Sequence, residues 1–475
     1  MLFCGICFLL FGDYPMPASS YARFAVAMAA APLSGEVLHA ARRCLIDWYA
    51  ASLPGSVLAP ATLLREALRD ELGSGSAQGR SRLLPDGLVA STRAAALING
   101  VASHTVEFDD IYSVGLYHPG SPVIAAALAL AERERASGET LLRAIIAGYE
   151  VSNRIAAAVN PAHYSCWHTT GTVGCFGAAI AAGCVLELDQ AQMKHALNGV
   201  ASMAAGLQQA FRTDAMTKPL HAGRAAESGV LAALAAKYGV TGAEQMLDGE
   251  RGFGKAMSKD VNWDDAVQGL GEQWTIVNTT QKNHGCCGHT FAAIDAVIEL
   301  RNAHKLSSHD IESIHVGTYA TALEICADYS PKTGYEGKFS LPYCAAVGLI
   351  DARVRLDAFD EAHLHDGEIR ELMSKVELAV DEQCQQVFPG QRSARVTIRT
   401  HDGRELKYHA KDRKGDPQAP LSDAEIVDKY RELAAPVLGQ GQAEMLLDAL
   451  WRVDVLDHVD ELPVTSAQVL SATGD

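Results

Sequence analysis

The sequence has no excess of basic residues, no long apolar segment and no regular cysteine framework, and each absence excludes a class of protein. Its 475 residues include 40 basic and 57 acidic side chains, a net charge of -17, which argues against nucleic acid as a partner. The 11 cysteines are odd in number and scattered, which favours a reducing cytoplasm over an oxidising compartment. We therefore expect a cytoplasmic protein without nucleic acid or membrane partners.

The apolar run that comes nearest to a targeting segment is the N-terminal stretch MLFCGICFLLFGDYP. It is too short to span a bilayer, lacks a basic start and is followed by no convincing cleavage site. Cys4 and Cys7 form a CxxC pair in it, but the strand–helix context that redox chemistry needs is missing. We expect the natural chain to start at Met16.

Apolar residues are plentiful and are spaced as in helices. They make up 48% of the chain, against 20% charged residues, which is typical of a folded globular protein, and the length predicts two domains. Alanine-rich segments with helical spacing fill most of the chain from residue 18 to about 260; they are 36–51, 90–104, 121–136, 140–158, 189–205 and 222–238. Their small side chains allow close packing into a dense helical bundle.

The pattern changes near residue 280. Residues 312–320 alternate as in a strand, and residues 393–410 are typical of two strands joined at Asp402-Gly403, a strong hairpin signal. Helices are expected between these strands, at 290–303 and 340–350. This part of the chain therefore predicts a smaller α+β unit.

The tail returns to helix. Ser422, followed by an acidic first turn, is a good helix start. We predict a mostly α fold: a large all-α helical domain built from both chain ends, residues 16–279 and 414–475, with a smaller α+β lid domain inserted at 280–413.

Four polar clusters interrupt the apolar helices. The first, HTVEFDDIYSVGLYHPGSP, contains Glu107, Asp109, Asp110 and His118. Three acids alone are more typical of a solvated helix end. The His-Pro-Gly-Ser turn, however, leads directly into a very apolar helix, which favours the wall of a cleft. Carboxylates and histidines in such a place suit acid–base chemistry.

The second cluster, HYSCWHTTGTVGCFGAA, places His168 before Thr169, Thr170 and Gly171 at a predicted helix start. Free amide groups there can hold an anion, and a histidine beside them can exchange a proton. A helix cap is an equally good interpretation of this segment by itself.

The third cluster, DAMTKPLHAGRAAESG, brings Lys218, His221 and Arg224 close to another helix start. Cations in this position suit a carboxylate site. Surface charge is the alternative, but the Ala, Gly and Leu residues around them favour a partly enclosed position.

The fourth cluster is KNHGCCGH, residues 282–289. Adjacent cysteines rarely bind one tetrahedral ion together, and no second pair has zinc spacing, so we expect no metal. A disulfide between neighbouring cysteines would close a strained ring. Lys282, His284, Cys287 and His289 are left as candidate proton carriers, charge donors or packing residues.

In this order, the four clusters resemble the MmgE/PrpD family, which includes 2-methylcitrate dehydratase, cis-aconitate decarboxylase and iminodisuccinate epimerase. The matching stretches are ALINGVASHTVEFDD, HPGSPVIAAALALAE, WHTTGTVGCFGAAIAAG, TKPLHAGRAAESGVLAALAA, LDGERGFGKAMS and KFSLPYCAAVGLIDARV. The resemblance covers nearly the whole chain from about residue 18. It implies a homodimer without metal or organic cofactor and a site in the cleft between a helical domain and a lid.

The resemblance also implies roles for single residues. The pocket residues it implies are Glu107, His118, His168, Lys218 and Lys282, with Asp109 in the same acidic signature. The expected substrate contacts are Asp110, Thr169, His221, Cys287, His289 and Tyr329, with Tyr335 as the alternative tyrosine. Cys287 stands where some members have histidine and Ile111 where some have threonine, which concerns the substrate more than the fold.

The implied chemistry takes place at a carbon next to a carboxylate of a small di- or tricarboxylic acid. Lys218 and Lys282 would bind the acid and stabilise the developing negative charge. Because they come from different domains, a substrate that bridges them could close the lid. His118 and His168 would carry protons, and Glu107 or Asp109 would raise the basicity of one of them.

We expect a cofactor-independent hydro-lyase of the 2-methylcitrate dehydratase kind. Decarboxylation of cis-aconitate and epimerisation of iminodisuccinate are alternatives, because all three reactions begin from the same stabilised carbanion. A non-catalytic protein that binds a metal or another ligand is the alternative of a different class.

Overall fold

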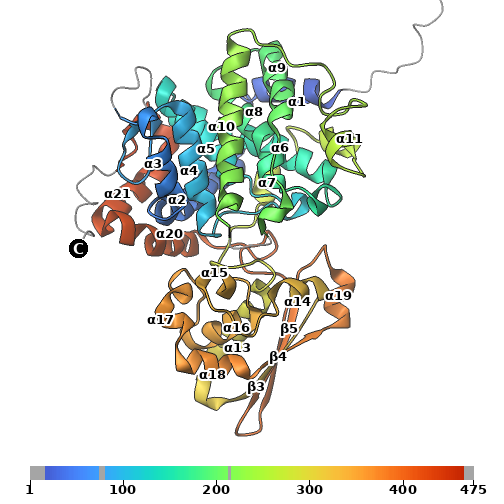
Figure 1. Ribbon diagram of the computed structural model, residues 1–475, viewed down its shortest axis with the longest axis vertical. Coiled ribbons are helices and arrows are strands. Elements are labelled where there is room, and N and C mark those ends of the chain that lie inside the picture. The colour runs from blue at the N-terminus through green and yellow to red at the C-terminus, as the bar shows by residue number, and fades with distance from the viewer. Residues whose placement is uncertain (1–15, 74–80, 212–214, 465–475) are drawn as a thin grey trace, which may run out of the picture.

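A computed structural model describes residues 16–73, 81–211 and 215–464. Cys4 and Cys7 lie outside these residues. The predicted mostly α fold is confirmed: a large helical body lies above a smaller body of helices and one sheet (Figure 1). Two separate apolar cores correspond to these bodies, one drawn from residues 18–277 and 421–462 and the other from residues 286–410. We name them the helical domain and the lid domain; their boundaries at 279/280 and 413/414 stay predictions.

The helical domain packs long helices around one another. Its helices of eleven residues or more are α1 Pro17–Ala27, α2 Gly35–Ser56, α4 Thr92–Thr105, α5 Gly120–Glu134, α6 Gly138–Val159, α8 Gly174–Val185, α9 Gln190–Val200, α10 Thr217–Lys237, α20 Asp423–Leu438 and α21 Gln440–Trp451. α4 and α10 approach so closely that a Cβ at Gly223 would lie 2.3 Å from the carbonyl oxygen of Leu97. The predicted dense packing of small residues is therefore found here.

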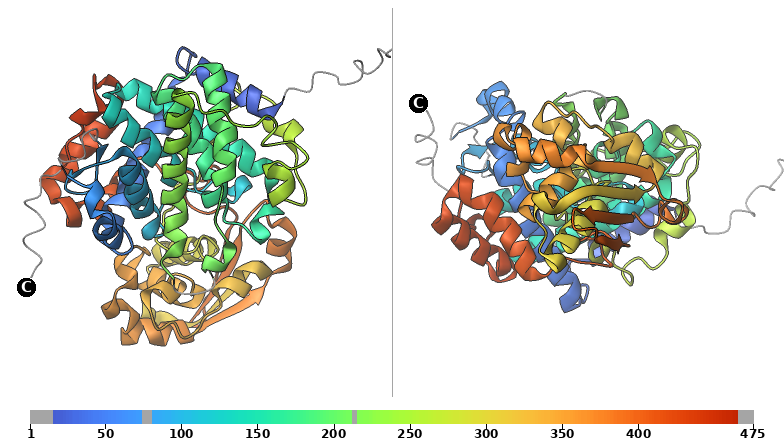
Figure 2. Two further views of the ribbon diagram at one scale, coloured as in Figure 1. Left: turned by 45° about the horizontal axis from the view of Figure 1, so that its top comes forward. Right: turned by 90° about the horizontal axis from the view of Figure 1, so that it is seen from below.

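The C-terminal helices return to the helical domain. Both views in Figure 2 place α20 and α21 against it, far from the sheet of the lid domain. The predicted start at Ser422 is confirmed as a capping box with Glu425. Inside the domain, Lys429 of α20 is buried and donates to Asp47 of α2 at 2.6 Å. This buried ion pair joins the two ends of the chain.

The lid domain holds a four-stranded sheet in the order β4-β3-β5-β6, of which only β3 and β4 are parallel. The strands are β3 Ile311–Thr318, β4 Val376–Val380, β5 Ala394–Thr400 and β6 Glu405–Ala410. Three helices pack beside the sheet (Figure 1): α13 Phe291–His304, α16 Leu341–Asp351 and α18 Gly367–Ser374. The predicted hairpin at Asp402-Gly403 is confirmed between β5 and β6, while β4 and α18 had no clear sequence signal.

The chain passes between the two domains twice, near residues 280 and 415, and these two segments lie next to each other. The backbone nitrogen of Gln281 donates to Gly415 at 3.0 Å, and Ile111 and Thr280 exchange backbone hydrogen bonds of 2.9 and 2.8 Å. A Cβ at Gly415 would lie 2.0 Å from the Gln281 carbonyl oxygen, so only glycine fits this approach. The chain therefore enters and leaves the lid domain next to the acidic turn that follows α4.

No helix among the described residues is long and apolar enough to cross a membrane.

Candidate functional site

The acidic turn between α4 and α5 lies at the junction of the two domains. Its first acid, Glu107, has φ 60°, in the left-handed region that few residues other than glycine adopt. Strained backbone of this kind persists only where surrounding structure holds it, and it occurs often at functional sites. Its side chain is nearly buried, with 12% exposed.

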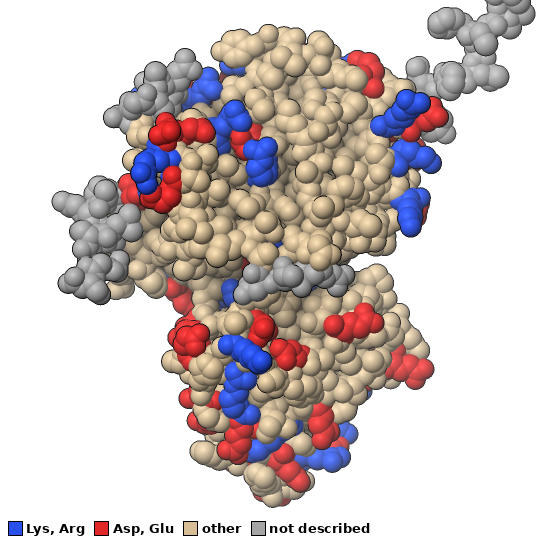
Figure 3. All heavy atoms as spheres, in the orientation of Figure 1, with Lys and Arg blue, Asp and Glu red and all other residues tan. Residues whose placement is uncertain are grey.

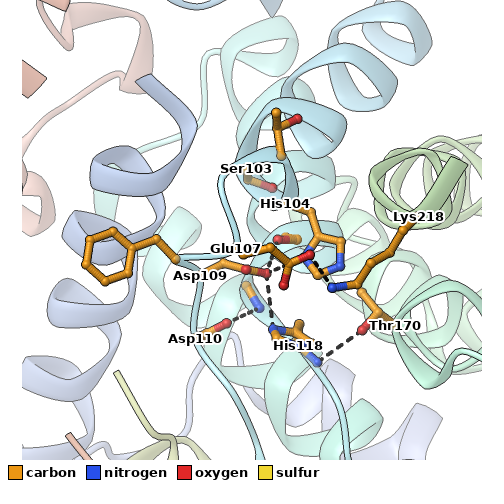
Figure 4. Close-up of polar contacts among 12 residues, drawn as sticks. Ser103, His104, Glu107, Asp109, Asp110, His118, Thr170 and Lys218 are labelled. Atoms are coloured by element: carbon orange, nitrogen blue, oxygen red, sulfur yellow. Dashed lines mark hydrogen bonds and ion pairs between the residues drawn. The ribbon is translucent and has the colours of Figure 1, made fainter. Parts of the chain in front are cut away.

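Asp109 lies between two histidines (Figure 4). His104, at the end of α4, donates from Nδ1 to Asp109 Oδ2 at 2.7 Å, and His118 Nδ1 lies 3.3 Å from the same oxygen. Ser121 also donates to it, at 2.8 Å. Burial alone would raise the pKa of Asp109, but the two histidines outweigh it and hold this pKa well below its usual range. Asp109 is therefore an anion that orients both imidazoles.

His118 is the more exposed histidine beside Asp109. Its side chain is 16% exposed, whereas that of His104 is fully buried. Burial lowers the pKa of His118 to about 4, although Asp109 opposes the shift. The ring is therefore neutral at pH 7, with a carboxylate in place to stabilise an added proton.

His168 and His221 extend the group to a chain of imidazole rings. His168 precedes the short helix α7 Thr169–Thr172, stacks on His104 with ring centroids 5.5 Å apart, and shares a 3.0 Å hydrogen bond with His221 of α10. Burial, together with the neighbouring His104 and Lys218, lowers the pKa of both His168 and His221. His221 borders a cavity of ≈ 590 Å³.

Glu107 holds cations from both domains. Lys218 of α10 forms an ion pair with its carboxylate, and Figure 4 shows the two side chains pointing towards each other. Lys282, from the lid side, donates to its backbone oxygen at 2.7 Å and lies 3.8 Å from its carboxylate. Burial alone would raise the pKa of Glu107, but Lys218 and Lys282 reverse the shift and hold it well below normal. The same pairing raises the pKa of Lys218 despite burial.

Two further cations of the lid domain reach this junction, and sequence reasoning missed both. Lys338 donates to the backbone oxygen of Val106 at 3.0 Å and has no ion pair among the described residues. Burial lowers its pKa to about 8, although Glu107 opposes this shift. Arg392 likewise makes no ion pair within 4 Å with a residue in the described ranges. It interacts electrostatically with Arg413 and, more weakly, with Tyr319, Asp416 and Tyr164 of the helical domain. These are the free charges of the junction.

The lid contributes a thiol, an imidazole and a tyrosine. Cys287 is partly exposed and interacts electrostatically with Lys282 and Glu107. His289 shares a 2.8 Å hydrogen bond with Tyr319, which is 1% exposed and follows β3. Tyr319 is a third residue that sequence reasoning missed; it lies at the end of the predicted strand 312–320, but nothing there marks it as a site residue.

The expected tyrosine, Tyr329, is not brought to this group. It is 44% exposed, and its hydroxyl group interacts with the backbone of Leu378 in the edge strand β4. No contact between Tyr329 and the residues around Glu107 is found in the described part of the chain. Tyr335, the alternative, packs against Phe339 with ring centroids 5.1 Å apart.

Two expected substrate contacts have internal partners instead. Asp110 is 3% exposed, accepts from the Gly120 backbone at 3.0 Å and from the Tyr149 hydroxyl group at 2.7 Å. Burial and the nearby Asp47 raise the pKa of Asp110 to about 8. Thr169 is fully buried and accepts from Asn160 at 3.2 Å. Asp110 and Thr169 therefore support the turn and the start of α7 through these hydrogen bonds, and their contact with a substrate stays a prediction.

Three other residues from the sequence clusters lie at the margin. His284 is paired with Asp295 at 2.9 Å within the lid. Arg224, whose side chain is exposed, pairs with the buried Glu227 on α10. Ile111 contributes its backbone to the bridge with Thr280. None of these side chains contacts Glu107 or Asp109 in the described residues.

His104, Asp109 and His118 are also the one group of described residues whose ligand atoms are close enough for a metal ion, within 4.8 Å of one another. The Lys282 ammonium lies 3.9 Å from Asp109 Oδ1, and Ser121 already donates to the other oxygen. A divalent cation here would face a fixed positive charge. The donor set therefore fits a metal poorly.

Comparisons with known proteins agree with this arrangement. The family model of the MmgE/PrpD N-terminal domain matches residues 19–266, and that of the MmgE/PrpD C-terminal domain matches residues 284–454. The chain belongs to the MmgE/PrpD family.

Three similar family members share a related name. The chain is 25% identical over 458 residues to the cis-aconitate decarboxylase-like protein oryM of Aspergillus oryzae, covering 90% of this chain and 93% of that one. It is 26% identical to cis-aconitate decarboxylase of Aspergillus terreus, covering 81% and 83%. It is 27% identical to the Homo sapiens cis-aconitate decarboxylase, covering 78% of each chain. These relatives are enzymes named for a small carboxylate substrate.

Proposed function

We propose that this MmgE/PrpD protein is a lyase that decarboxylates a small tricarboxylic acid, cis-aconitate in the first instance. The observation that carries the proposal is the meeting of cations from both domains around Glu107, beside the Asp109–His118 pair. The sequence favoured a 2-methylcitrate dehydratase, but the similar proteins are named as decarboxylases and support the alternative better.

The charge at the junction suits a polycarboxylate. The whole chain carries -17, yet Lys218, Lys282, Lys338 and Arg392 converge here. Glu107 satisfies Lys218 and approaches Lys282, which leaves Lys338 and Arg392 free to bind carboxylates. A charge-assisted hydrogen bond in a nearly buried place is among the stronger polar contacts. Two or three such contacts would hold a tri-anion in one orientation.

The reaction follows from this orientation. When a carboxylate leaves as CO2, its bonding electron pair stays on the substrate and spreads over the unsaturated carbons and a remaining carboxylate. Ammonium groups already in place stabilise that charge without reorganisation. Lys282 and Lys338 are suited to this because both are held by backbone oxygens, at 2.7 and 3.0 Å.

A proton must then be delivered to carbon. His118 is the best proton carrier because it is the more exposed member of its group and Asp109 lies 3.3 Å from its Nδ1. Its neutral ring would first take up a proton from solvent, stabilised by Asp109, and then pass it to the carbon. His168, expected in the same role, is 1% exposed and stacks on His104. We assign His168 to the support of the imidazole chain, and His118 to proton transfer.

The proposal includes no metal or organic cofactor. The charge of Lys282 beside Asp109 supports this. The proposed steps also need only side chains: cations bind and stabilise the carboxylates, and a histidine carries the proton. Activity that is unchanged by a strong chelator, and not raised by added divalent metal, is the expected result.

A homodimer is part of the proposal. Figure 3 shows that the face of the helical domain around α10 carries few charged side chains. Three hydrophobic side chains are exposed near the cavity beside His221: Met203, Leu207 and Met216. A face with exposed hydrophobic side chains and few charges suits contact with a second copy of the chain. Light scattering on the purified protein at several concentrations tests whether two chains associate.

Proton NMR with candidate acids tests the reaction. The protein is incubated separately with cis-aconitate, 2-methylcitrate, citrate and iminodisuccinate in D2O. Release of CO2 from cis-aconitate, with deuterium in the product, is expected. A new olefinic signal from 2-methylcitrate without loss of carbon would instead indicate the dehydratase, and exchange in iminodisuccinate alone the epimerase. No turnover of any acid would contradict the proposed function.

A further inference from the structure

The adjacent cysteines Cys286 and Cys287 do not pair with each other. The thiol of Cys287 interacts with that of Cys326 at the end of α14 Ala320–Cys326, whereas the thiol of Cys286 interacts with that of Cys344 of α16. The chain thus directs neighbouring side chains to opposite partners. Each of the two adjacent cysteines therefore has a second thiol nearby, without the strained ring that a disulfide between them would require.

Backbone contacts hold the first pair in register. The backbone nitrogen of Cys287 donates to Lys338 at 2.9 Å, and Ala327, next to Cys326, forms a bridge with Ser340. Residues 338–340 therefore lie between the two loops and attach to both. Because each cysteine is tied to the same short segment, their proximity is a fixed property of the lid.

The two thiol pairs differ in access. Cys287 is partly exposed beside Lys282 and Glu107, while Cys326 behind it is fully buried. Cys286 and Cys344 are both fully buried. Of these four cysteines only Cys287 has surface open to solvent, so it is the one that we expect a small molecule to reach.

Charged and polar groups around Cys287 favour its thiolate. The Cys326 thiol lowers the pKa of Cys287 most, and the His289 backbone N–H and the charge of Lys282 lower it further; burial and Glu107 oppose them. Across the junction, Tyr164 of the helical domain also interacts with it. By contrast, burial and Cys286 raise the pKa of Cys344. Thiolate character and exposure together determine which cysteines react with oxidants.

We propose that Cys287 and Cys326 form a peroxide-reactive pair, a modification site in which Cys287 is the attacking thiolate and Cys326 the resolving thiol. The Cys287 thiolate attacks one oxygen of hydrogen peroxide, the O–O bond breaks, and a sulfenic acid and hydroxide form. The Cys326 thiol then attacks the Cys287 sulfur, which releases water and forms the disulfide. In total, two thiols and one peroxide give one disulfide and two waters.

The disulfide would change the junction. It removes the partial negative charge of Cys287 beside Lys282 and ties the loop that carries Lys282 to the end of α14. Loss of lyase activity on oxidation is therefore expected. This consequence rests on the proposed function, whereas the disulfide itself does not.

The test uses the full chain and detects the disulfide itself. Reduced protein is treated with a small molar excess of hydrogen peroxide at pH 7, free thiols are alkylated, and proteolytic peptides are analysed by mass spectrometry. A Cys287–Cys326 cross-link that dithiothreitol reverses is expected. The Cys286–Cys344 pair is the internal control for two neighbouring thiols that are buried. Exposed Cys166 is the control for a thiol that solvent reaches but that has no second thiol beside it among the described residues.

Three results would overturn the proposal. They are a Cys286–Cys287 disulfide, equal oxidation of both thiol pairs, and oxidation of Cys166 with Cys287 left unchanged. The Cys326→Ser variant adds a second measurement: Cys287 should then proceed to the sulfinic acid, which dithiothreitol does not reverse. If that variant fails to fold, the cross-link in the unaltered chain still decides the matter, and it does so even if no lyase activity is found.

Discussion

Lys282 of the lid side donates to the backbone oxygen of Glu107 at 2.7 Å, so the two domains meet at the residue with φ 60°. Lys338 makes the matching contact to Val106, one residue earlier, at 3.0 Å. Two lid cations thus hold one strained turn of the helical domain. Any movement of the lid would change the charge around Glu107 directly, so under the proposed function we expect substrate binding to be coupled to closure.

Removing Lys218 tests the cation cluster. Lys218→Met keeps a chain of similar length but deletes the ammonium that pairs with Glu107. We expect kcat/KM to fall by about 10²–10³-fold, the usual effect of losing one preorganised donor. The matched control is Lys194→Met on α9, which breaks an exposed ion pair with Glu244 and should leave the rate unchanged. Equal rates for both variants would contradict the assignment of Lys218.

Asp109→Asn tests the orientation of His118. The amide is the same size, but it cannot stabilise a protonated imidazole, so kcat should fall by roughly 10²–10⁴-fold. Asp360→Asn is the matched control, because Asp360 contacts His363 at 3.0 Å in an exposed position and asparagine also caps helices. A lower melting temperature with normal kcat would show that Asp109 has only a structural role.

The pKa of Lys338 predicts how substrate binding depends on pH. Its pKa of about 8 means that the ammonium is mostly charged at pH 7 and mostly neutral at pH 9. Binding of a polycarboxylate should therefore weaken as pH rises, and KM should increase by about tenfold between these values, in proportion to the lost charged fraction. Steady-state kinetics of Lys338→Met should show a high KM that no longer rises over this range. A parallel rise in the variant would assign the effect to another group.

The two lid tyrosines can be separated by single-atom changes. Tyr319→Phe removes the hydroxyl group that bonds His289 at 2.8 Å, and we expect kcat/KM to fall by about 5–10-fold, the worth of one buried hydrogen bond. Tyr329→Phe changes an exposed group at the edge strand and should have no effect. A large loss of activity in Tyr329→Phe with none in Tyr319→Phe would instead show that Tyr329 is the tyrosine that acts in the site.

Local signals account for what the sequence predicts well. The helix start at Ser422 and the hairpin at Asp402-Gly403 depend on residues within one turn of each other, and both are found. Lys218 and Lys282 could also be identified, because each stands in a recognisable polar cluster. The sequence does not show that both meet Glu107, since that contact depends on how the lid is placed.

The missed residues are those whose position is set by tertiary structure. Lys338 and Arg392 stand singly in the sequence, and only the fold of the lid brings them to the junction. Tyr319 and Tyr329 lie ten residues apart; in the structure Tyr319 directly follows β3, which ends at Thr318, whereas Tyr329 lies further along the chain. His104 did have a signal, because it lies on α4 directly before the acidic turn, at the head of the first polar cluster.

Buried histidines make the folded protein sensitive to acid. Burial, the largest cause in each case, lowers the pKa of His118, His163 and His221 to about 4. The unfolded chain takes up these protons near pH 6.5 and the folded chain does not, so the free energy of unfolding falls as pH drops from about 6.5 towards 4. Each histidine should contribute about 1 kcal/mol per pH unit in this window.

The contribution of one histidine can be isolated. Raised pKa values of Asp110, about 8, and Glu132, about 7, act in the opposite direction, so differences between variants are more informative than the total. His163→Gln keeps a polar group near Thr172 but cannot be protonated. Urea unfolding at pH 7, 6 and 5 should show its pH slope reduced by about 1 kcal/mol per unit, with exposed His304→Gln as control. Equal slopes in both variants would mean that His163 is protonated as readily in the folded chain as in the unfolded one.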